Sequence, residues 1–201
     1  MNAWAAASLT VLSTFLGGAI AAITAVYLEQ RKETKRLSQL RNIIKDGILD
    51  DLSHSLTLYD RIQDEWEKSK VVWFSTITEF QESRQTYTQH RDYVLLLNNQ
   101  ELRKKLFRYY LKTNEQLNLA QYQQQRIYDI GRKYKELLRD IGLRSPELPP
   151  EESQSLAMHI MKDENAELIR LQSDMPQTVN RIFTFKAEAQ EIINELVDLK
   201  C

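Results

Sequence analysis

The chain has 201 residues, of which 27 are Lys or Arg and 28 are Asp or Glu, for a formal net charge of −1. All of these charged residues lie after position 28, which excludes an ordinary soluble globule. The single cysteine, Cys201, excludes an intrachain disulfide framework. A hydrophobic content of 42% with almost no net charge argues against disorder and against a strongly basic nucleic-acid-binding domain.

Residues 1–28 are predicted to form a transmembrane helix. From Ala3 to Leu28 the sequence is apolar and is interrupted only by Ser and Thr hydroxyls. A bilayer core of about 30 Å needs roughly 20 helical residues, so this run is long enough to cross it. Because the run is longer than a signal-peptide core and has no basic segment before it, we expect it to be retained.

The charges beside this helix predict its orientation. No charged side chain precedes it, whereas four basic residues follow it closely, namely Arg31, Lys32, Lys35 and Arg36. By the positive-inside rule, the N-terminus lies outside and the remainder of the chain lies in the cytoplasm. We therefore expect a single-pass protein of the inner membrane.

Small side chains recur at every fourth position of the predicted span: Ser13, Gly17, Ala21 and Ala25, with Gly18 beside them. Such a stripe lets helix backbones approach closely and favours self-association within lipid. The alternative is a passive anchor, because Gly and Ala are common in membrane helices. The span holds no ionisable residue, so a pore formed here would be lined by hydroxyls and small apolar groups.

Residues 29–143 are predicted to form long cytoplasmic helices: a membrane-proximal basic helix and then a helical hairpin. From Leu37 to Trp66 apolar residues recur about every 3.6 residues, the period of a helix with one buried face. No breaker precedes this stretch, so it is expected to continue directly from the membrane span. A turn is expected at residues 68–70.

Two further helical stretches are predicted after that turn. The first begins near Val71 and ends at Asn98 and Asn99, and its apolar face comprises Trp73, Ile77, Phe80, Tyr87 and Val94. The second begins after Asn98, which stands three residues before Glu101 as in a capping box, and it runs to Ile141.

A Pro-rich loop is predicted at residues 144–152, and residues 153–201 are predicted to form acidic helices of the same bundle. These helices are expected to break near residues 162–165, and Pro176 is expected in the first turn of a final helix. No segment needs to be a β-strand. The predicted fold class is therefore all-α, with one N-terminal transmembrane helix continuing into a cytoplasmic bundle of four to five helices.

Charge is distributed unevenly along the predicted bundle. Residues 100–145 hold 11 basic and 5 acidic side chains, and residues 146–201 hold 5 and 11. These opposite charges predict that the two regions pack against each other, within or between subunits. The basic and aromatic mixture from Arg103 to Lys112 is also a candidate surface for RNA or a partner, through Arg103, Lys104, Lys105 and Arg108. The simpler interpretation pairs these residues with the acidic helices, and nucleic acid is disfavoured.

The sequence contains few motifs that indicate catalysis or metal binding. The sequence holds no phosphate-binding glycine loop, dinucleotide fingerprint or hydrolase motif, and His54, His90 and His159 have no partner at metal-ligand spacing. No cofactor and no metal are expected.

One motif, RQTYTQH, places Arg84 six residues before His90. This spacing resembles the Arg-x4-6-His signature of the HEPN ribonucleases, helical proteins in which two such motifs meet across a dimer. The resemblance implies that His90 acts as general acid and base and that Arg84 holds the scissile phosphate. On a straight helix, however, the two side chains point about 120° apart. A buried, paired Arg84 on the apolar face is the alternative, and we expect no enzyme.

The layout of the whole chain resembles the small accessory membrane proteins of type VI-B CRISPR systems, with RQTYTQH as a degraded HEPN-like motif. This resemblance implies a homo-oligomeric membrane pore that strengthens antiviral defence by an RNA-guided nuclease, with that nuclease or its products as partners. The leading prediction is therefore a self-assembling, pore-forming membrane effector. The alternatives are a membrane-tethered scaffold that recruits a cytoplasmic partner and, less favoured, a HEPN-like ribonuclease.

Overall fold

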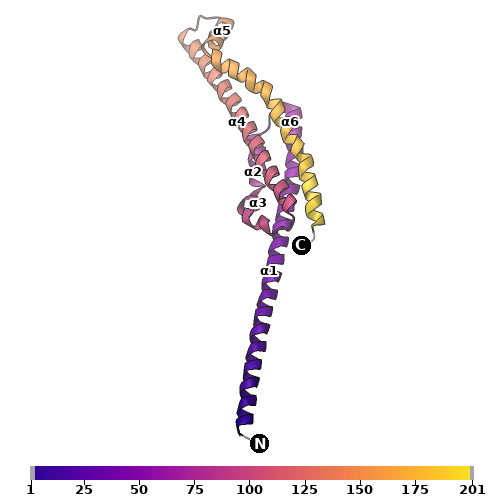
Figure 1. Ribbon diagram of the computed structural model, residues 1–201. Helices are drawn as coiled ribbons and strands as arrows, with labels where there is room; N and C mark the ends of the chain where they lie inside the picture. The colour runs from indigo at the N-terminus through magenta and orange to yellow at the C-terminus, as the bar shows by residue number, and fades with distance from the viewer. Residues whose placement is uncertain (1–2, 200–201) are drawn as a thin grey trace.

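The computed structural model describes the backbone of residues 3–199 and the side chains of residues 23–84 and 87–199. In this part of the chain all regular structure is helical, which confirms the all-α prediction. The elements are α1 (Ala3–Ser69), α2 (Phe74–Glu82), α3 (Gln85–Gln89), the 3-10 helix η1 (Arg91–Leu96), α4 (Gln100–Arg144), α5 (Pro150–Ile160) and α6 (Lys162–Asp198). The molecule is elongated, with α1 projecting from one end and α5 lying at the other (Figure 1).

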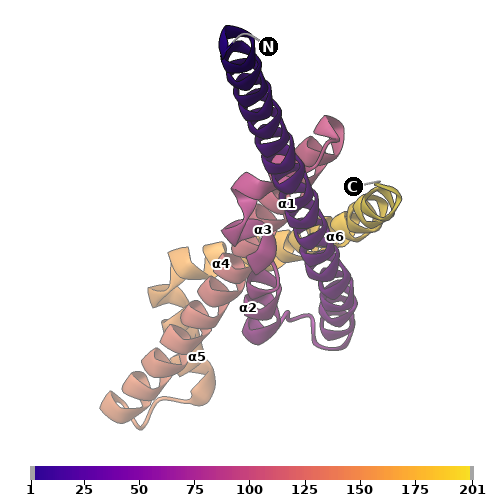
Figure 2. The ribbon, with the colours of Figure 1, turned by 90° about the horizontal axis from the view of Figure 1, so that it is seen from below.

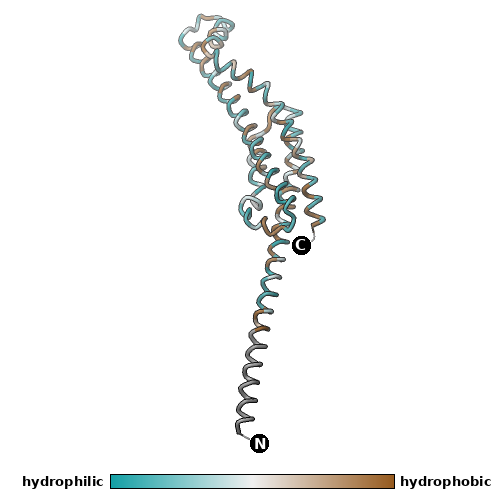
Figure 3. The backbone as a smooth tube through the Cα atoms, viewed as in Figure 1, coloured by the Kyte–Doolittle hydropathy of each residue, from teal (hydrophilic) through white to brown (hydrophobic). Residues whose placement is uncertain are grey.

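Helix α1 continues without a break for 67 residues, as predicted. At 1.5 Å per residue it is roughly 100 Å long. Its second half carries the buried side chains of Ile48, Leu52 and Ile62, whereas every described side chain from Ile23 to Leu37 is exposed. The part of α1 before Ser38 therefore projects from the helical bundle, and we call it the free rod. The side chains at the start of its fully described part, from Ile23 to Leu28, are mostly apolar (Figure 3).

Two basic residues of α1 mark the start of the bundle. The Nε of Arg41 donates to the carbonyl of Leu96 at 2.8 Å, at the end of η1. The Nζ of Lys45 donates to the carbonyl of Leu199 at 2.8 Å, just beyond α6. Cations placed against helix C-termini neutralise the negative end of the helix dipole. The C-terminal end of α6 therefore lies beside α1 where the free rod begins (Figure 1).

The turn expected at residues 68–70 is present. Lys70 adopts a positive φ of 55° and its N–H donates to the carbonyl of Trp66 at 3.0 Å, which ends α1. The carboxylate of Glu65 then accepts from the backbone N–H of Trp73 at 2.8 Å and from the hydroxyl of Thr76 at 2.6 Å. One side chain of α1 thus caps the start of α2.

The stretch from Val71 to Asn99 was predicted to be one helix, but it forms three short ones, α2, α3 and η1. The prediction of a continuous helix was therefore wrong. Distant side chains bind its backbone: the Asp51 carboxylate accepts from the N–H of Tyr87 at 3.1 Å. The Nη1 of Arg103 donates to the carbonyls of Leu95 and Leu97 at 3.0 and 2.6 Å. The predicted apolar face is otherwise correct, except that Trp73 is 60% exposed.

Helix α4, with 45 residues, is the longest helix after α1. It is capped by Asn99, whose side chain accepts from the N–H of Leu102 at 3.1 Å, and not by Asn98 as predicted. The loop after it comprises only residues 145–149, because α5 already begins at Pro150. The break predicted near residues 162–165 lies at Met161, between α5 and α6.

Pro176 does not begin a final helix, contrary to the prediction, but lies inside α6. Proline removes one backbone hydrogen bond and costs about 3 kcal/mol in a helix interior. Burial of Leu171 and Met175 before it and of Val179 after it holds both parts of α6 against the bundle and offsets this cost. Helix α6 changes direction along its length (Figure 1).

The core is shared by α1, α4, α6 and the α2–η1 segment. Figure 2 shows α1 crossing in front of α4 and α6, with α2 and α3 to one side of it. The main cluster of buried residues includes Ile48, Phe80, Leu106 and Ile182. A second, smaller cluster of Ile130, Met161 and Leu171 holds the far end of α4 to α5 and α6.

The opposite charges of α4 and α6 meet within one subunit, which confirms that prediction. Lys105 donates to Glu191 at 2.7 Å and also pairs with Glu195. These two hydrogen bonds raise the pKa of the Lys105 ammonium, and Lys105 lowers the pKa of Glu191. Further along, Arg126 forms two bonds of 2.8 Å with Glu167.

The predicted transmembrane helix falls mainly on residues that the structure does not describe in full. Residues 1–2 and the side chains of residues 3–22 lie outside the described residues. Within the fully described residues, no helix has an apolar run long enough to cross a membrane.

Candidate functional site

The buried side chain of Arg84 lies at the junction of α2 and α3, and only 4% of it is exposed. Its guanidinium carbon lies 4.8 Å from the centre of the Tyr110 ring and 5.4 Å from that of Tyr109. Its Nη1 donates to the backbone carbonyl of Tyr110 at 3.2 Å. Its Nε and Nη2 are buried and have no hydrogen-bond partner. Arg84 is thus buried, as the alternative interpretation expected, but no salt bridge pairs it among the described residues. The aromatic faces stabilise its charge instead.

A cluster of tyrosines surrounds this arginine. The rings of Tyr87 and Tyr110 are stacked, with centres 3.8 Å apart and an angle of 8° between them. The hydroxyls of Tyr59 and Tyr109 lie 3.1 Å apart in the core. Burial raises the pKa of the Tyr59, Tyr109 and Tyr110 hydroxyls above the ordinary value, because it disfavours the phenolate.

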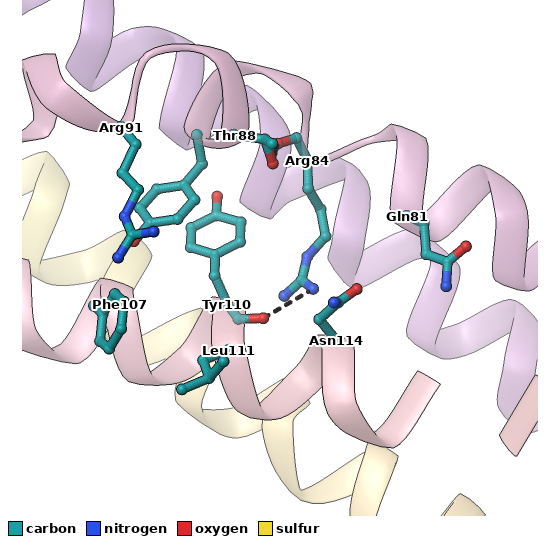
Figure 4. A pocket seen from close by; sticks show the side chains of 9 residues that line it. Gln81, Arg84, Thr88, Arg91, Phe107, Tyr110, Leu111 and Asn114 are labelled. Atoms are coloured by element: carbon teal, nitrogen blue, oxygen red, sulfur yellow. Dashed lines mark hydrogen bonds between the residues drawn. The ribbon is translucent and has the colours of Figure 1, made fainter. Parts of the chain in front are cut away.

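A groove of about 420 Å³ opens beside Arg84, between the α2–η1 segment and α4 (Figure 4). Its lining comprises Gln81, Arg84, Tyr87, Thr88, Arg91, Phe107, Tyr110, Leu111 and Asn114. This lining holds two cations and no carboxylate. Arg91 extends toward Phe107, with the guanidinium carbon 4.9 Å from the ring centre.

A second hollow of about 330 Å³ continues the groove along α4, and Phe107 lines both. Its other lining residues are Gln100, Arg103, Lys104 and Arg108. Both hollows therefore have a positive lining without an acidic residue, and they lie on the first half of α4. An anion would be attracted to this surface.

The structure does not bring the two residues of the ribonuclease motif together within one chain. Arg84 is buried and lines the groove, whereas His90 is exposed and is not part of the lining. The His90 ring lies 6.0 Å from the Tyr93 ring. Among the described residues, no group of three or more His, Cys, Asp or Glu could hold a metal ion.

The four predicted basic surface residues of α4 have different surroundings. Arg103 binds the end of η1 and Lys105 binds α6. Lys104 pairs with Glu101 on its own helix at 2.8 Å. Arg108 is exposed and lines the second hollow. The candidate surface is therefore smaller than predicted, because two of its cations hold the fold together.

No family model, no curated protein and no solved structure matches this chain. The resemblance to accessory membrane proteins of CRISPR systems and the antiviral role that it implies therefore stay predictions.

Helix α4 forms one wall of the groove, and this wall was not predicted from the sequence. Phe107, Leu111 and Asn114 recur at intervals of three and four residues, a spacing that places them on one face. That face lies beside the buried stripe of Leu106, Tyr109 and Thr113, and the stripe was the stronger signal. The sequence did contain one signal for this site. Arg84 and Arg91 are seven residues apart, or about two turns of a helix.

The residues predicted for packing in the membrane cannot be placed as side chains. Ser13, Gly17, Gly18 and Ala21 lie among the residues whose side chains are not described, and Ala25 is exposed on α1. The four predicted membrane-proximal cations are also exposed on the free rod: Arg31, Lys32, Lys35 and Arg36.

Proposed function

We propose that this chain is a membrane-anchored helical protein whose copies assemble side by side, with residues 1–28 in the bilayer and the bundle on its cytoplasmic side. The observation that carries this proposal is the free first half of α1. The helix runs from Ala3 to Ser69, yet the bundle covers it only from about Leu40 onward. None of the other described helices lies beside the exposed part (Figure 1).

A single helix without tertiary contacts is marginal in water, because most helical stability in proteins comes from packing of an apolar face. The exposed part of α1 carries large apolar side chains, including Ile23, which is 70% exposed, and Tyr27, which is 62% exposed. Together with the uncharged run of residues 3–28, this favours lipid or further copies of the chain as the missing cover.

The cations that follow the uncharged run support the same placement. Arg31, Lys32, Lys35 and Arg36 are exposed, whereas Arg41 is engaged at the start of the bundle. Basic residues next to a membrane span gain about 1 kcal/mol each near an anionic leaflet. The segment between the bundle and the proposed span thus has the charge that a cytoplasmic membrane surface attracts.

Assembly is proposed to use the small-residue stripe of Ser13, Gly17, Ala21 and Ala25. The test is the mass of the detergent-extracted full-length protein, measured for the wild type and for Gly17→Leu. We expect an oligomer that Gly17→Leu dissociates. Ala19→Leu is the matched control, because position 19 lies on another face of the helix, and it should leave the mass unchanged. A wild-type monomer contradicts the proposal.

Formation of a pore is the proposed output of this assembly. Protein reconstituted into vesicles is expected to release a trapped dye, and replacing residues 1–28 by an unrelated membrane helix should abolish the release. Intact vesicles at protein densities where the oligomer is present would exclude a pore while leaving the anchored assembly in place.

A membrane-tethered scaffold is the second candidate, and the cation-lined groove of the bundle favours it. Such a protein keeps its partner binding when residues 1–28 are replaced by another membrane helix, whereas a pore-former loses its output. A ribonuclease is not proposed, because His90 is exposed and does not line the groove that Arg84 lines.

A further inference from the structure

We propose that the groove between the α2–η1 segment and α4 is a binding site for a small aromatic phosphate monoester, with Arg91 and Arg84 holding the phosphate. This inference does not depend on assembly in the membrane, since it rests on the bundle alone. Four observations support it: the unpartnered donors of Arg84, the position of Arg91, the lining charge and the dimensions of the groove.

The first observation is that Arg84 is 4% exposed yet has two nitrogens, Nε and Nη2, without an acceptor. A buried donor without a partner destabilises the folded state, and more so when it is charged. None of the ion pairs among the described residues involves Arg84 or Arg91. Figure 4 shows the Arg84 guanidinium directed toward Tyr110 and Asn114 of α4. An anion in the groove would supply the acceptor that the fold lacks.

The second observation is the position of Arg91. It is an exposed residue whose guanidinium lies 4.9 Å from the centre of the Phe107 ring. A guanidinium against an aromatic ring keeps its N–H donors available at its edge for two parallel bonds to a phosphate. Phe107 is 42% exposed, so an aromatic group of the ligand can lie against it and Leu111.

The third and fourth observations distinguish a small ligand from a nucleic acid. The lining holds Arg84 and Arg91 without an acidic residue, and its volume of about 420 Å³ is within the range of small-molecule sites. Single-stranded RNA needs successive exposed aromatic faces. Tyr87 and Tyr110 cannot provide them, because they are stacked on each other and are 8% and 5% exposed. Phe107 is the remaining aromatic of the lining.

The test is titration of the full-length protein in detergent with phenyl phosphate, followed by calorimetry and by the melting temperature. We expect saturable binding and a ligand-dependent rise in the melting temperature, because a ligand that binds only the folded state stabilises it. Inorganic phosphate carries the charge alone and phenol the ring alone, so each should bind at least tenfold more weakly than phenyl phosphate.

The variants separate the site from general electrostatics. Arg91→Gln should weaken phenyl phosphate at least tenfold while leaving the melting temperature of the free protein unchanged. Lys135→Gln, an exposed lysine farther along α4 and outside both hollows, removes the same charge and should leave the affinity unchanged. Arg84→Met, used only after its melting temperature confirms a folded protein, should also weaken binding.

The proposal is overturned by absence of saturable binding of phenyl phosphate, or by equal affinity of wild type and Arg91→Gln. It is also overturned if a ten-nucleotide single-stranded RNA binds through Arg91 while phenyl phosphate does not, because the groove would then be part of a nucleic-acid surface. Each of these results leaves the anchored assembly untouched, since that is measured by particle mass.

Discussion

The hydroxyls of Tyr59 on α1 and Tyr109 on α4 lie 3.1 Å apart and face each other in the centre of the bundle. Both side chains are at most 1% exposed. The pair joins the helix that forms the free rod to the helix that forms the groove. It gives each of these buried hydroxyls a hydrogen-bond partner.

Removal of one hydroxyl of this pair should destabilise the bundle. Tyr59→Phe and Tyr109→Phe are each expected to lower the free energy of unfolding by about 1 kcal/mol, because the remaining hydroxyl loses its partner. The double variant should cost less than the sum of the two, as measured by urea unfolding. Strict additivity would show that the two hydroxyls do not interact.

The stability of the bundle should fall at alkaline pH. Burial raises the pKa of Tyr59, Tyr109 and Tyr110 above the ordinary value of 10.0. The unfolded chain therefore releases these protons first, and stability that is fully present below pH 10 is lost as the pH rises above it. Unfolding followed against pH should show this loss together with late tyrosinate absorbance. Replacing all three by Phe should move the loss to higher pH, and an unchanged curve would contradict the assignment.

Arg84 should matter more for stability than its groove neighbour Arg91. Arg84→Ala is expected to cost about 2–4 kcal/mol, since it removes a charged hydrogen bond, contacts with aromatic faces and buried volume. Arg84→Met should cost less, because it keeps the volume and removes the donors without acceptors. Arg91→Ala, on an exposed residue, should stay within about 0.5 kcal/mol. Equal losses for Arg84→Ala and Arg91→Ala in chemical denaturation would contradict this.

Exchanging the charges of the ion pair between α4 and α6 should restore the stability that a single charge reversal removes. Lys105→Glu places a third carboxylate beside Glu191 and Glu195 and should lower the melting temperature by several degrees, less so at high salt. Adding Glu195→Lys to this variant should restore most of the loss. Lys112→Glu, an exposed lysine on the same helix, is the control and should have little effect. Failure of the double variant to recover would mean that the pairing contributes nothing measurable.

Several features that follow from local sequence were predicted correctly, although the cap of α4 and the place of Pro176 were not. The uninterrupted α1 and its end near Lys70 depend on helical period and on the absence of a breaker, both of which a single segment reveals. The pairing of basic α4 with acidic α6 followed from composition. The fragmentation of residues 74–96 did not. It depends on bonds from Asp51 and Arg41, which lie 36 and 55 residues from the groups they bind, and on a bond from Arg103 of the following helix.

The candidate site was predictable only in part, for the same physical reason. Arg84 stood out in the sequence, and its place on an apolar face indicated burial, which is confirmed. Arg91 shared that face but is exposed, because the chain leaves α3 and enters η1 before it. Its contact with Phe107 joins two elements whose approach is decided by tertiary packing. The spacing of apolar residues within one segment cannot predict this contact.

Because α1 supplies both the free rod and the core residues Ile48, Leu52 and Ile62, the bundle has no joint between them. The only glycine of α1 after residue 28 is Gly47, which already lies inside the bundle. A tilt or axial rotation imposed on the first half of the helix would therefore be transmitted as torque to the tyrosine cluster and to the wall of the groove. Such a motion would reach the bundle first at Arg41 and Lys45, the two side chains that bind α1 to the ends of η1 and α6.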